Sequence, residues 1–481
     1  MSGILTRVVA LALALLPAEL AAQASTPASA AVAEAERIMA EYADPDAPGA
    51  VAAVVSRGDV VYVNAVGLAS LEQRTRLAPT SILDIGSVAK QFTAYAIVLL
   101  ESRGKLSLDD DIRVHLPEVP DFADPITIRQ LLTHTSGLRE IYNTATLGGR
   151  RGGDAMTQED ALRVVRAQPS LQFAPGSEHL YNNTGYMLLA DIVERVTGEE
   201  FHVWMRDEVF APLGMTSTVV MHTLGQVIPR SADSYELTED SNYVRIFDNS
   251  TIQGAGGVYT NVEDLTRWLR TWVDARPETA PLLERLQQRA VLTSGDTLDY
   301  ALGVNVGFDH GLRTIRHTGS SAGFRTVFAV YPEIRGGVIV QSNFADFETG
   351  DLAEELSRAF FGEHMDVAAA DDADSDDDDD DDEDSATWTP AADALAEYAG
   401  TFYSAEIGTV YRFSVRADTL ILRHRRIGEL ALEPREPDVF RAGHGLGTLR
   451  FDRDAAGSVA GFTISNGRTR GVRFERLRTG R

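Results

Sequence analysis

A run of acidic residues near the C-terminal end constrains this chain most. Twelve acids stand between Asp371 and Asp384, interrupted only by Ala373 and Ser375. Side chains of like charge at this density repel one another, so we expect residues 366–388 to form an extended, solvated linker. A weak calcium site is the alternative, although carboxylates bind calcium well only in a fixed cage. The linker divides the chain into residues 25–365 and 389–481.

The length of the chain agrees with this division, and its charge limits the partners it can bind. The chain has 481 residues, whereas a single domain usually stops growing at roughly 250–300 residues. With 44% hydrophobic residues, it can bury a sizeable core. The formal net charge is −27, and about −15 remains once the twelve acids of the run are set aside. This charge argues against binding to nucleic acid or to an anionic membrane surface.

Residues 1–24 have the pattern of a secretory signal peptide. Arg7 gives a positive start, Val8 to Leu16 form a short apolar run, and Ala22-Gln23-Ala24 is a small-x-small cleavage site. We therefore expect an exported protein, periplasmic or secreted, without a transmembrane segment. An uncleaved amphipathic helix is the alternative.

The residue types exclude several kinds of site. There is no cysteine, which excludes disulfides, thiolate zinc sites and a cysteine nucleophile. The ten histidines do not form an HExxH pattern. We therefore expect neither a metal nor another cofactor.

The pattern of apolar residues predicts an α+β fold. Two β-rich segments at 51–55 and 60–63 flank Arg57-Gly58-Asp59 and predict a hairpin. Helices are expected at about 31–42 and 87–103, with a helical region over about 126–290. Later strands are expected at 301–306, 312–317, 324–331 and 337–342. These strands and the hairpin would form one antiparallel sheet with flanking helices. Residues 391–481 predict a small all-β barrel or sandwich.

The first candidate catalytic group is Ser87-Val88-Ala89-Lys90. Residues three apart share one face of a helix, so the hydroxyl and the amine would be neighbours at a helix start. A serine becomes a good nucleophile when a base takes its proton, and a desolvated lysine can be that base. Only two of the 44 basic residues are lysines. The other lysine belongs to Ser102-Arg103-Gly104-Lys105, which straddles a helix end and is expected to be a solvated loop. The alternative is that Lys90 lies along the helix surface with its amine in solvent.

A Tyr-x-Asn pattern occurs three times, at Tyr62, Tyr181 and Tyr259. The first lies in the predicted hairpin and is expected to pack in the core. The third opens a helix, where Asn261 or Thr260 would be a cap. The second enters the predicted helix 185–197, so Tyr181 and Asn183 would face a cleft. Tyr181 would relay protons and Asn183 would bind an amide. A buried core tyrosine is the alternative for Tyr181.

His317-Thr318-Gly319 closes a predicted strand. Gly319 would let a substrate backbone approach closely. The backbone N–H of Ser320 would join that of Ser87 as an oxyanion hole. A single histidine is more often structural, and His134-Thr135-Ser136 is a similar tripeptide in a helix–loop segment.

Together these motifs resemble those of the serine β-lactamase and penicillin-binding-protein superfamily. The resemblance is to the branch that holds class C β-lactamases, D-Ala-D-Ala carboxypeptidases, D-aminopeptidases and esterases. It covers about residues 30–362 and includes the stretches 131–138, 212–215 and 254–258. Tyr398 to Ser404 resembles the start of the lipocalin-like domains attached to some of these hydrolases.

The resemblance implies a role for each site residue. Ser87 would be acylated, and Lys90 and Tyr181 would share the work of the general base, in an order that stays open. Asn183 would hold the substrate amide. His317 would take the position that is lysine in class C β-lactamases, and histidine there is typical of peptidases and esterases.

Three hypotheses for the function follow. The first is an amide or ester hydrolase, with D-amino-acid peptides as a candidate substrate. The second is a carboxylesterase or a weak β-lactamase, in which penicillin would acylate Ser87 with slow turnover. The third, from another class, is a non-catalytic binding protein on the same fold, which would be unaffected by Ser87→Ala.

Overall fold

The computed structural model describes residues 27–366 and 388–477. The predicted signal peptide and almost all of the predicted acidic linker lie outside the described residues. Within the described ranges, no helix combines the length and the apolar character needed to span a membrane.

A six-stranded antiparallel sheet forms the base of the larger part, and it confirms the predicted α+β fold. Its strand order is β10-β11-β12-β13-β1-β2, so the N-terminal hairpin pairs with the last strand, β13. The strands are β1 (Ala50–Ser56), β2 (Asp59–Val66), β10 (Asn305–Asp309), β11 (Leu312–Ser321), β12 (Phe324–Tyr331) and β13 (Gly336–Ser342).

The strand expected at 301–306 is wrong in its position, since β10 begins at Asn305. Gly303 has a φ of +77°, and the Ala301 N–H donates to the Val304 carbonyl, so this segment turns instead of extending. A Cβ on Gly303 would lie 2.8 Å from the Lys90 carbonyl oxygen. The apolar residues 301–304 are therefore buried in a tight turn packed against the helix that carries Lys90.

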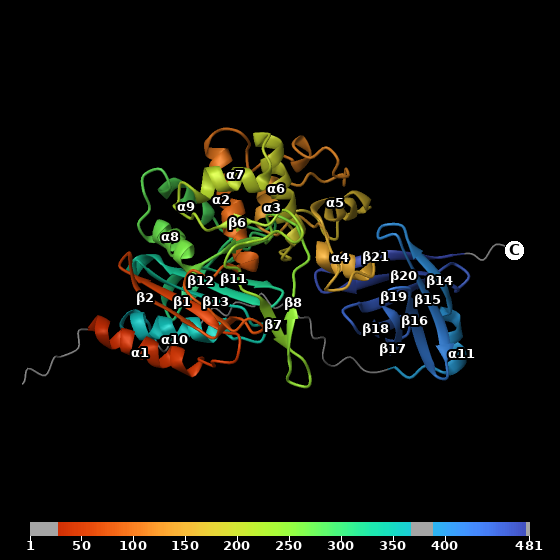
Figure 1. Cartoon of the computed structure of the whole chain (residues 1–481). Coiled ribbons are helices and arrows are strands. Elements are labelled where there is room, and N and C mark those ends of the chain that lie inside the picture. The colour runs from red at the N-terminus through yellow and green to blue at the C-terminus, as the bar shows by residue number, and fades with distance from the viewer. Residues whose placement is uncertain (1–26, 367–387, 478–481) are drawn as a thin grey trace, which may run out of the picture.

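Helices cover both faces of the sheet (Figure 1). On one face lie α1 (Pro27–Glu41) and α10 (Thr349–Phe361). On the other, α8 (Val262–Val273) packs against β1 and β13, below the helical region. That region contains α2 (Lys90–Ser102), α3 (Ile128–Leu132), α4 (Ile141–Leu147), α5 (Gln158–Ala167), α6 (Asn183–Thr197), α7 (Phe201–Trp204) and α9 (Ala280–Leu286).

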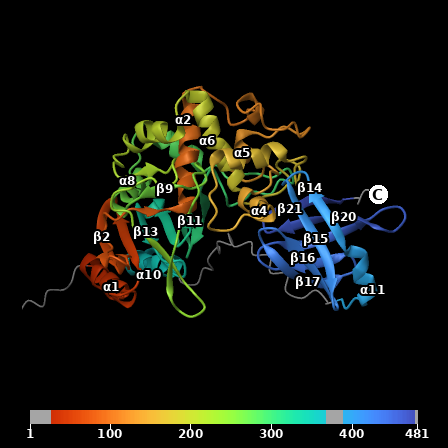
Figure 2. The same cartoon turned by 45° about the vertical axis from the view of Figure 1, so that its right-hand side comes forward.

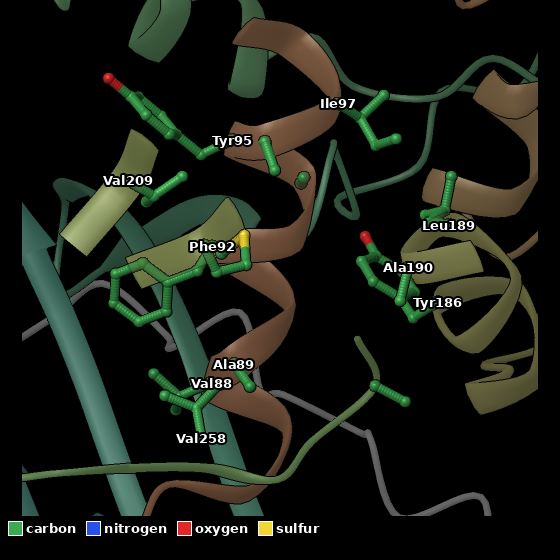
Figure 3. Packing of buried hydrophobic residues seen from close by; sticks show 14 of the residues in the cluster. Val88, Ala89, Phe92, Tyr95, Ile97, Tyr186, Leu189, Ala190, Val209 and Val258 are labelled. Carbon is green, nitrogen blue, oxygen red and sulfur yellow. The ribbon is translucent and has the colours of Figure 1, made fainter. Parts of the chain in front are cut away.

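Helix α2 runs through the middle of the main core (Figure 3). Nearly all of its residues are buried, which is typical of a helix surrounded by other elements. Phe92 contacts Trp268 of α8, with ring centres 5.0 Å apart, and Ala190 and Tyr186 of α6 lie on another side. This packing fixes the start of α2, where Lys90 is the first residue.

The C-terminal part is a closed eight-stranded barrel, β14 to β21, in which each strand pairs with the next and β14 pairs with β21. It confirms the predicted all-β domain as a barrel rather than a sandwich. The strands are β14 (Gly400–Ser404), β15 (Thr409–Arg416), β16 (Thr419–His424), β17 (Gly428–Glu436), β18 (Val439–Ala442), β19 (Gly447–Arg453), β20 (Val459–Asn466) and β21 (Thr469–Arg476).

Aromatic side chains fill the barrel. Phe402, Phe413 and Phe462 are almost completely buried and lie 5.4 Å apart between ring centres. The likeness of this part to lipocalin-like domains stays a prediction.

The barrel docks on the larger part through α4 (Figures 1 and 2). Leu147 is fully buried within the barrel's core cluster, and its carbonyl accepts a hydrogen bond of 2.9 Å from the Tyr411 hydroxyl. The hydroxyls of Thr144 and Thr469 are 3.0 Å apart. The barrel is therefore held by both apolar and polar contacts.

Candidate active site

The predicted site residues converge on one cleft of about 1070 Å³. Lys90 is fully buried next to Ser87, while the other residues line the cleft, namely Ser87, Tyr181, Asn183, His317, Thr318, Gly319 and Ser320. Segments more than 200 residues apart in the sequence therefore meet at one place.

Ser87 and Lys90 lie at the junction of a 3₁₀ turn, Gly86–Ala89, with α2. The Lys90 amine is 3.0 Å from the Ser87 hydroxyl oxygen. It also lies 2.8 Å from the Asn183 side-chain oxygen and 2.8 Å from the Ala255 carbonyl. The predicted alternative of a solvent-exposed amine is wrong, because Lys90 is 0% exposed.

Asn183 is the first residue of α6, and Asn182 caps that helix by accepting the Gly185 N–H. The Asn183 amide nitrogen donates to Glu140, at 2.9 Å. A carboxylate only accepts, so this bond fixes the orientation of the amide and turns its oxygen toward Lys90.

Tyr181 lies against the same amine, with its ring centre 4.8 Å from Lys90 Nζ. Its other side contacts His134, at 4.3 Å between ring centres. The His134 Nδ1 accepts the Asn182 N–H, so this histidine supports the loop that carries Tyr181. Burial lowers the pKa of His134 well below its usual value, so the imidazole is neutral.

The other two Tyr-x-Asn copies are where the sequence predicts them. Tyr62 packs in the core beneath α1 and α10. Asn261 caps α8, and its side chain accepts the Asp264 N–H at 2.8 Å.

His317 is buried in β11 and is held at both ring nitrogens. Nδ1 is 2.6 Å from the Thr318 carbonyl, which can only accept, so Nδ1 carries the proton. Nε2 therefore accepts the Tyr300 hydroxyl, at 3.1 Å. Burial, and then the neighbouring Lys90, lower the pKa of His317 to about 3. The imidazole is neutral at physiological pH.

The strand β11 passes close to the 3₁₀ turn of Ser87. A Cβ on Gly319 would lie 2.0 Å from the Ile85 carbonyl oxygen and 3.2 Å from the Ser87 nitrogen. The expected reason for Gly319 therefore needs correction, since the close approach is made by the protein's own backbone. A Cβ on Gly86 would lie 2.6 Å from the Ser320 nitrogen. The backbones of Ser87 and Ser320 are thus neighbours, as an oxyanion hole requires.

A buried carboxylate lies beneath this junction. Asp84 is 1% exposed and accepts the Gly86 N–H at 2.9 Å and the Ser321 hydroxyl at 2.7 Å. Burial, and then the neighbouring Asp248 carboxylate, raise the pKa of Asp84 to about 7 from its usual 3.8. Between these two pKa values, the Asp84 carboxyl keeps its proton in the folded state and loses it in the unfolded state.

This shift predicts a pH dependence of stability. The stabilisation of the folded state that comes from protonated Asp84 is fully present below pH 3.8 and is lost as the pH rises to about 7. The wild type should lose unfolding free energy between pH 5 and pH 8. In Asp84→Asn this loss should be smaller by about 3 kcal/mol, at 1.36 kcal/mol per pKa unit. Urea unfolding of both proteins at the two pH values measures this difference, and parallel losses would contradict it.

Three residues of the site were not predicted from the sequence, namely Glu140, Tyr300 and the supporting His134. Glu140 lies two residues after the stretch 131–138 and His134 lies within it, so that motif was the available signal for both. Tyr300 reaches the site only through tertiary contacts.

Comparison with known proteins identifies the family. The family model described as Beta-lactamase matches residues 35–363. The chain belongs to the β-lactamase family. This match and the relatives below confirm the predicted relationship with β-lactamases and penicillin-binding proteins, and the prediction of a β-lactamase-related serine hydrolase.

Two relatives show which kinds of known protein this β-lactamase family member is similar to. It is 30% identical over 328 residues to Penicillin-binding protein 4* of Bacillus subtilis, covering 64% of this chain and 72% of that protein. It is 28% identical over 333 residues to a D-aminopeptidase of Brucella anthropi, covering 67% of this chain. The matched region spans 62% of the D-aminopeptidase, which is less than two thirds of its length.

Solved structures show the same fold. An octameric penicillin-binding protein homologue from Pyrococcus abyssi has a TM-score of 0.59 at 23% identity, covering 92% of this chain and 99% of that one. A D-stereospecific amidohydrolase from Streptomyces sp. has a TM-score of 0.57 at 21% identity, covering 69% of this chain and 98% of that one.

Proposed function

We propose that this β-lactamase family member is an exported serine hydrolase that cleaves amide or ester bonds through an acyl-enzyme on Ser87. The observation that carries the proposal is the contact of 3.0 Å between the Ser87 hydroxyl and a fully buried lysine amine. Burial of an amine is costly unless its protons are paired, and here they point at named acceptors. D-amino-acid peptides are the proposed substrates, since several relatives are named D-aminopeptidase.

The hydrogen bonds suit Lys90 as a base. A neutral amine has two N–H groups and one lone pair. The Asn183 oxygen and the Ala255 carbonyl can only accept, so they take the two N–H groups. The lone pair of a neutral amine can take the proton of the Ser87 hydroxyl across the contact of 3.0 Å.

The proposed reaction has two stages. The Ser87 oxygen attacks the carbonyl carbon, and its proton passes to Lys90 or Tyr181. The oxyanion is stabilised by the backbone N–H groups of Ser87 and Ser320. The C–N or C–O bond then breaks, and the leaving amine or alcohol takes the proton. Water attacks the acyl-enzyme, releasing the acid and restoring the Ser87 hydroxyl.

His317 contributes to this site as a neutral group. Its Nε2 accepts the Tyr300 hydroxyl and its Nδ1–H donates to Thr318, so both ring nitrogens are engaged.

A penicillin would acylate Ser87 by the same first stage, so a slowly turned-over β-lactam would act as an inhibitor.

A fluorophosphonate serine probe tests the proposal, with the intact mass as readout. We expect one adduct on the wild type and none on Ser87→Ala. The matched control is Ser102→Ala, which alters the other Ser-x-x-Lys copy, where the exposed hydroxyl donates to the Leu99 carbonyl. Ser102→Ala should be labelled like the wild type. Hydrolysis by Ser87→Ala should fall by about 10³-fold or more, as for other serine hydrolases that lose the nucleophile.

The same proteins test the substrate class. Wild type should hydrolyse D-alanine p-nitroanilide faster than the L-enantiomer. Activity on short esters alone would favour a carboxylesterase. A folded wild type without an adduct would contradict catalysis and favour a binding protein.

A further inference from the structure

The turn between β20 and β21 brings one barrel residue to the active-site cleft. This turn is Gly467-Arg468, and Arg468 lines the same cleft as Ser87. Its guanidinium carbon lies 4.9 Å from the ring centre of Tyr181. We propose that Arg468 binds an anionic group of the substrate, so that the enzyme prefers substrates with a carboxylate close to the scissile bond. The inference rests on the proposed function and narrows its substrate class.

The position of Arg468 is fixed by hydrogen bonds of its own carbonyl and of the two residues that follow it. The Gln172 amide donates to the Arg468 carbonyl at 3.2 Å and accepts the Arg470 N–H at 3.0 Å. The Thr469 hydroxyl donates to the Glu140 carbonyl at 2.9 Å. Glu140 also holds Asn183. The turn is therefore anchored to the residue that orients the catalytic amide, and its arginine needs little ordering when a ligand binds.

Arg468 also lies close to the reacting groups. The ring of Tyr181 contacts both Lys90 Nζ, at 4.8 Å, and the Arg468 guanidinium. A ligand joined to Ser87 therefore lies in the same cleft as the Arg468 guanidinium. Within the cleft, the guanidinium is placed to meet a group next to the acyl carbon or the leaving group.

The other cationic groups of the cleft are engaged with the protein. Arg150 donates to the Asp154 carbonyl, and Arg325 donates to two backbone carbonyls, those of Ala322 and Phe324. Arg316, which also lines the cleft, has an interaction within the protein as well. His317 is neutral. In contrast, no carboxylate among the described residues forms an ion pair with Arg468. Its planar fork of N–H groups therefore remains for a carboxylate of the substrate.

A pair of boronic acids tests this inference without a known substrate, because boronates bind reversibly to activated serines. 3-Carboxyphenylboronic acid and 3-carbamoylphenylboronic acid have nearly the same shape and differ in charge. Their inhibition constants are measured from the slowing of fluorophosphonate labelling of Ser87. We expect the wild type to bind the carboxylate about tenfold more tightly than the carboxamide, as for a charge-assisted contact of about 1.4 kcal/mol.

Three variants locate the effect. Arg468→Gln should bring the ratio of the two constants close to one, and Arg468→Lys should keep part of it. The matched control is Arg470→Gln on the same hairpin, where the exposed guanidinium pairs with Glu178 at 2.9 Å. It should keep the wild-type ratio.

The outcomes separate the two proposals. An unchanged ratio in Arg468→Gln, or a wild type that prefers the carboxamide, would overturn the role of Arg468 alone. Equal weakening of both boronates in Arg468→Gln would assign Arg468 to supporting Tyr181 and would also overturn it. A folded wild type that the phosphonate does not label would overturn the proposed function, and this inference with it.

Discussion

Replacement of Lys90 by methionine should reduce the rate of Ser87 acylation by about 10³-fold, within the range typical of a lost general base. Methionine keeps the length of the side chain, so the core around α2 stays filled. The amine that now contacts the Ser87 hydroxyl, the Asn183 oxygen and the Ala255 carbonyl is removed. The rate of labelling by the fluorophosphonate probe, followed by mass, measures this loss directly.

The chain offers a clean control for this experiment. Lys105 is the other lysine and is exposed after the end of α2. Lys105→Met should therefore label at the wild-type rate. If Lys90→Met were labelled as fast as Lys105→Met, Lys90 would not be the base, and Tyr181 would be the group to test next.

The second large effect is on stability. Arg139 and Glu406 form an ion pair between the hydrolase domain and the barrel, with side chains only 6% and 4% exposed. Arg139→Ala would leave the Glu406 carboxylate buried without its partner, which typically costs about 3–5 kcal/mol. Burial already raises the pKa of Glu406, so the carboxylate should take a proton in the variant as the pH falls. The loss should therefore be smaller at pH 5 than at pH 7.

Urea unfolding followed by circular dichroism measures this effect. An exposed pair across the same interface, Arg426 with Asp154, provides the control. Arg426→Ala should cost no more than about 1 kcal/mol, as for surface pairs. The double variant Arg139→Met with Glu406→Leu should lose less than Arg139→Ala, because no charge is left buried. Equal losses for Arg139→Ala and Arg426→Ala would contradict the prediction.

Much of the fold could be predicted because its elements have strong local signals. The first hairpin, β12 and β13, and the long helices have regular apolar patterns and clear turns. The misplaced strand at 301–306 shows the limit of such patterns. The pattern of its apolar residues predicts an extended segment, whereas Gly303 turns the chain so that they pack against α2. The same residue types are compatible with a strand and with a buried turn. The tertiary contact with Lys90 favours the turn.

The motifs of the candidate site could also be recognised, because each has a short and ordered pattern. The roles of the residues that support these motifs could not be recognised in the same way. Glu140, His134 and Tyr300 act on Asn183, Tyr181 and His317 only after the chain has folded. Arg468 is the extreme case, since nothing in its neighbourhood on the barrel indicates that a tyrosine of the other domain lies 4.9 Å away. Contacts of this kind have no periodicity that a sequence pattern could reveal.

The position of β1 in the sheet has a consequence for the order of folding. β1 pairs with β13, and the contact between Gly49 and Asn343, at the ends of these two strands, joins residues 294 positions apart. During synthesis, the first hairpin therefore leaves the ribosome long before its main partner exists. The barrel is different, because its neighbouring strands follow one another in sequence. Since distant pairings must close long loops, we expect the sheet to assemble late and the barrel to fold from local contacts.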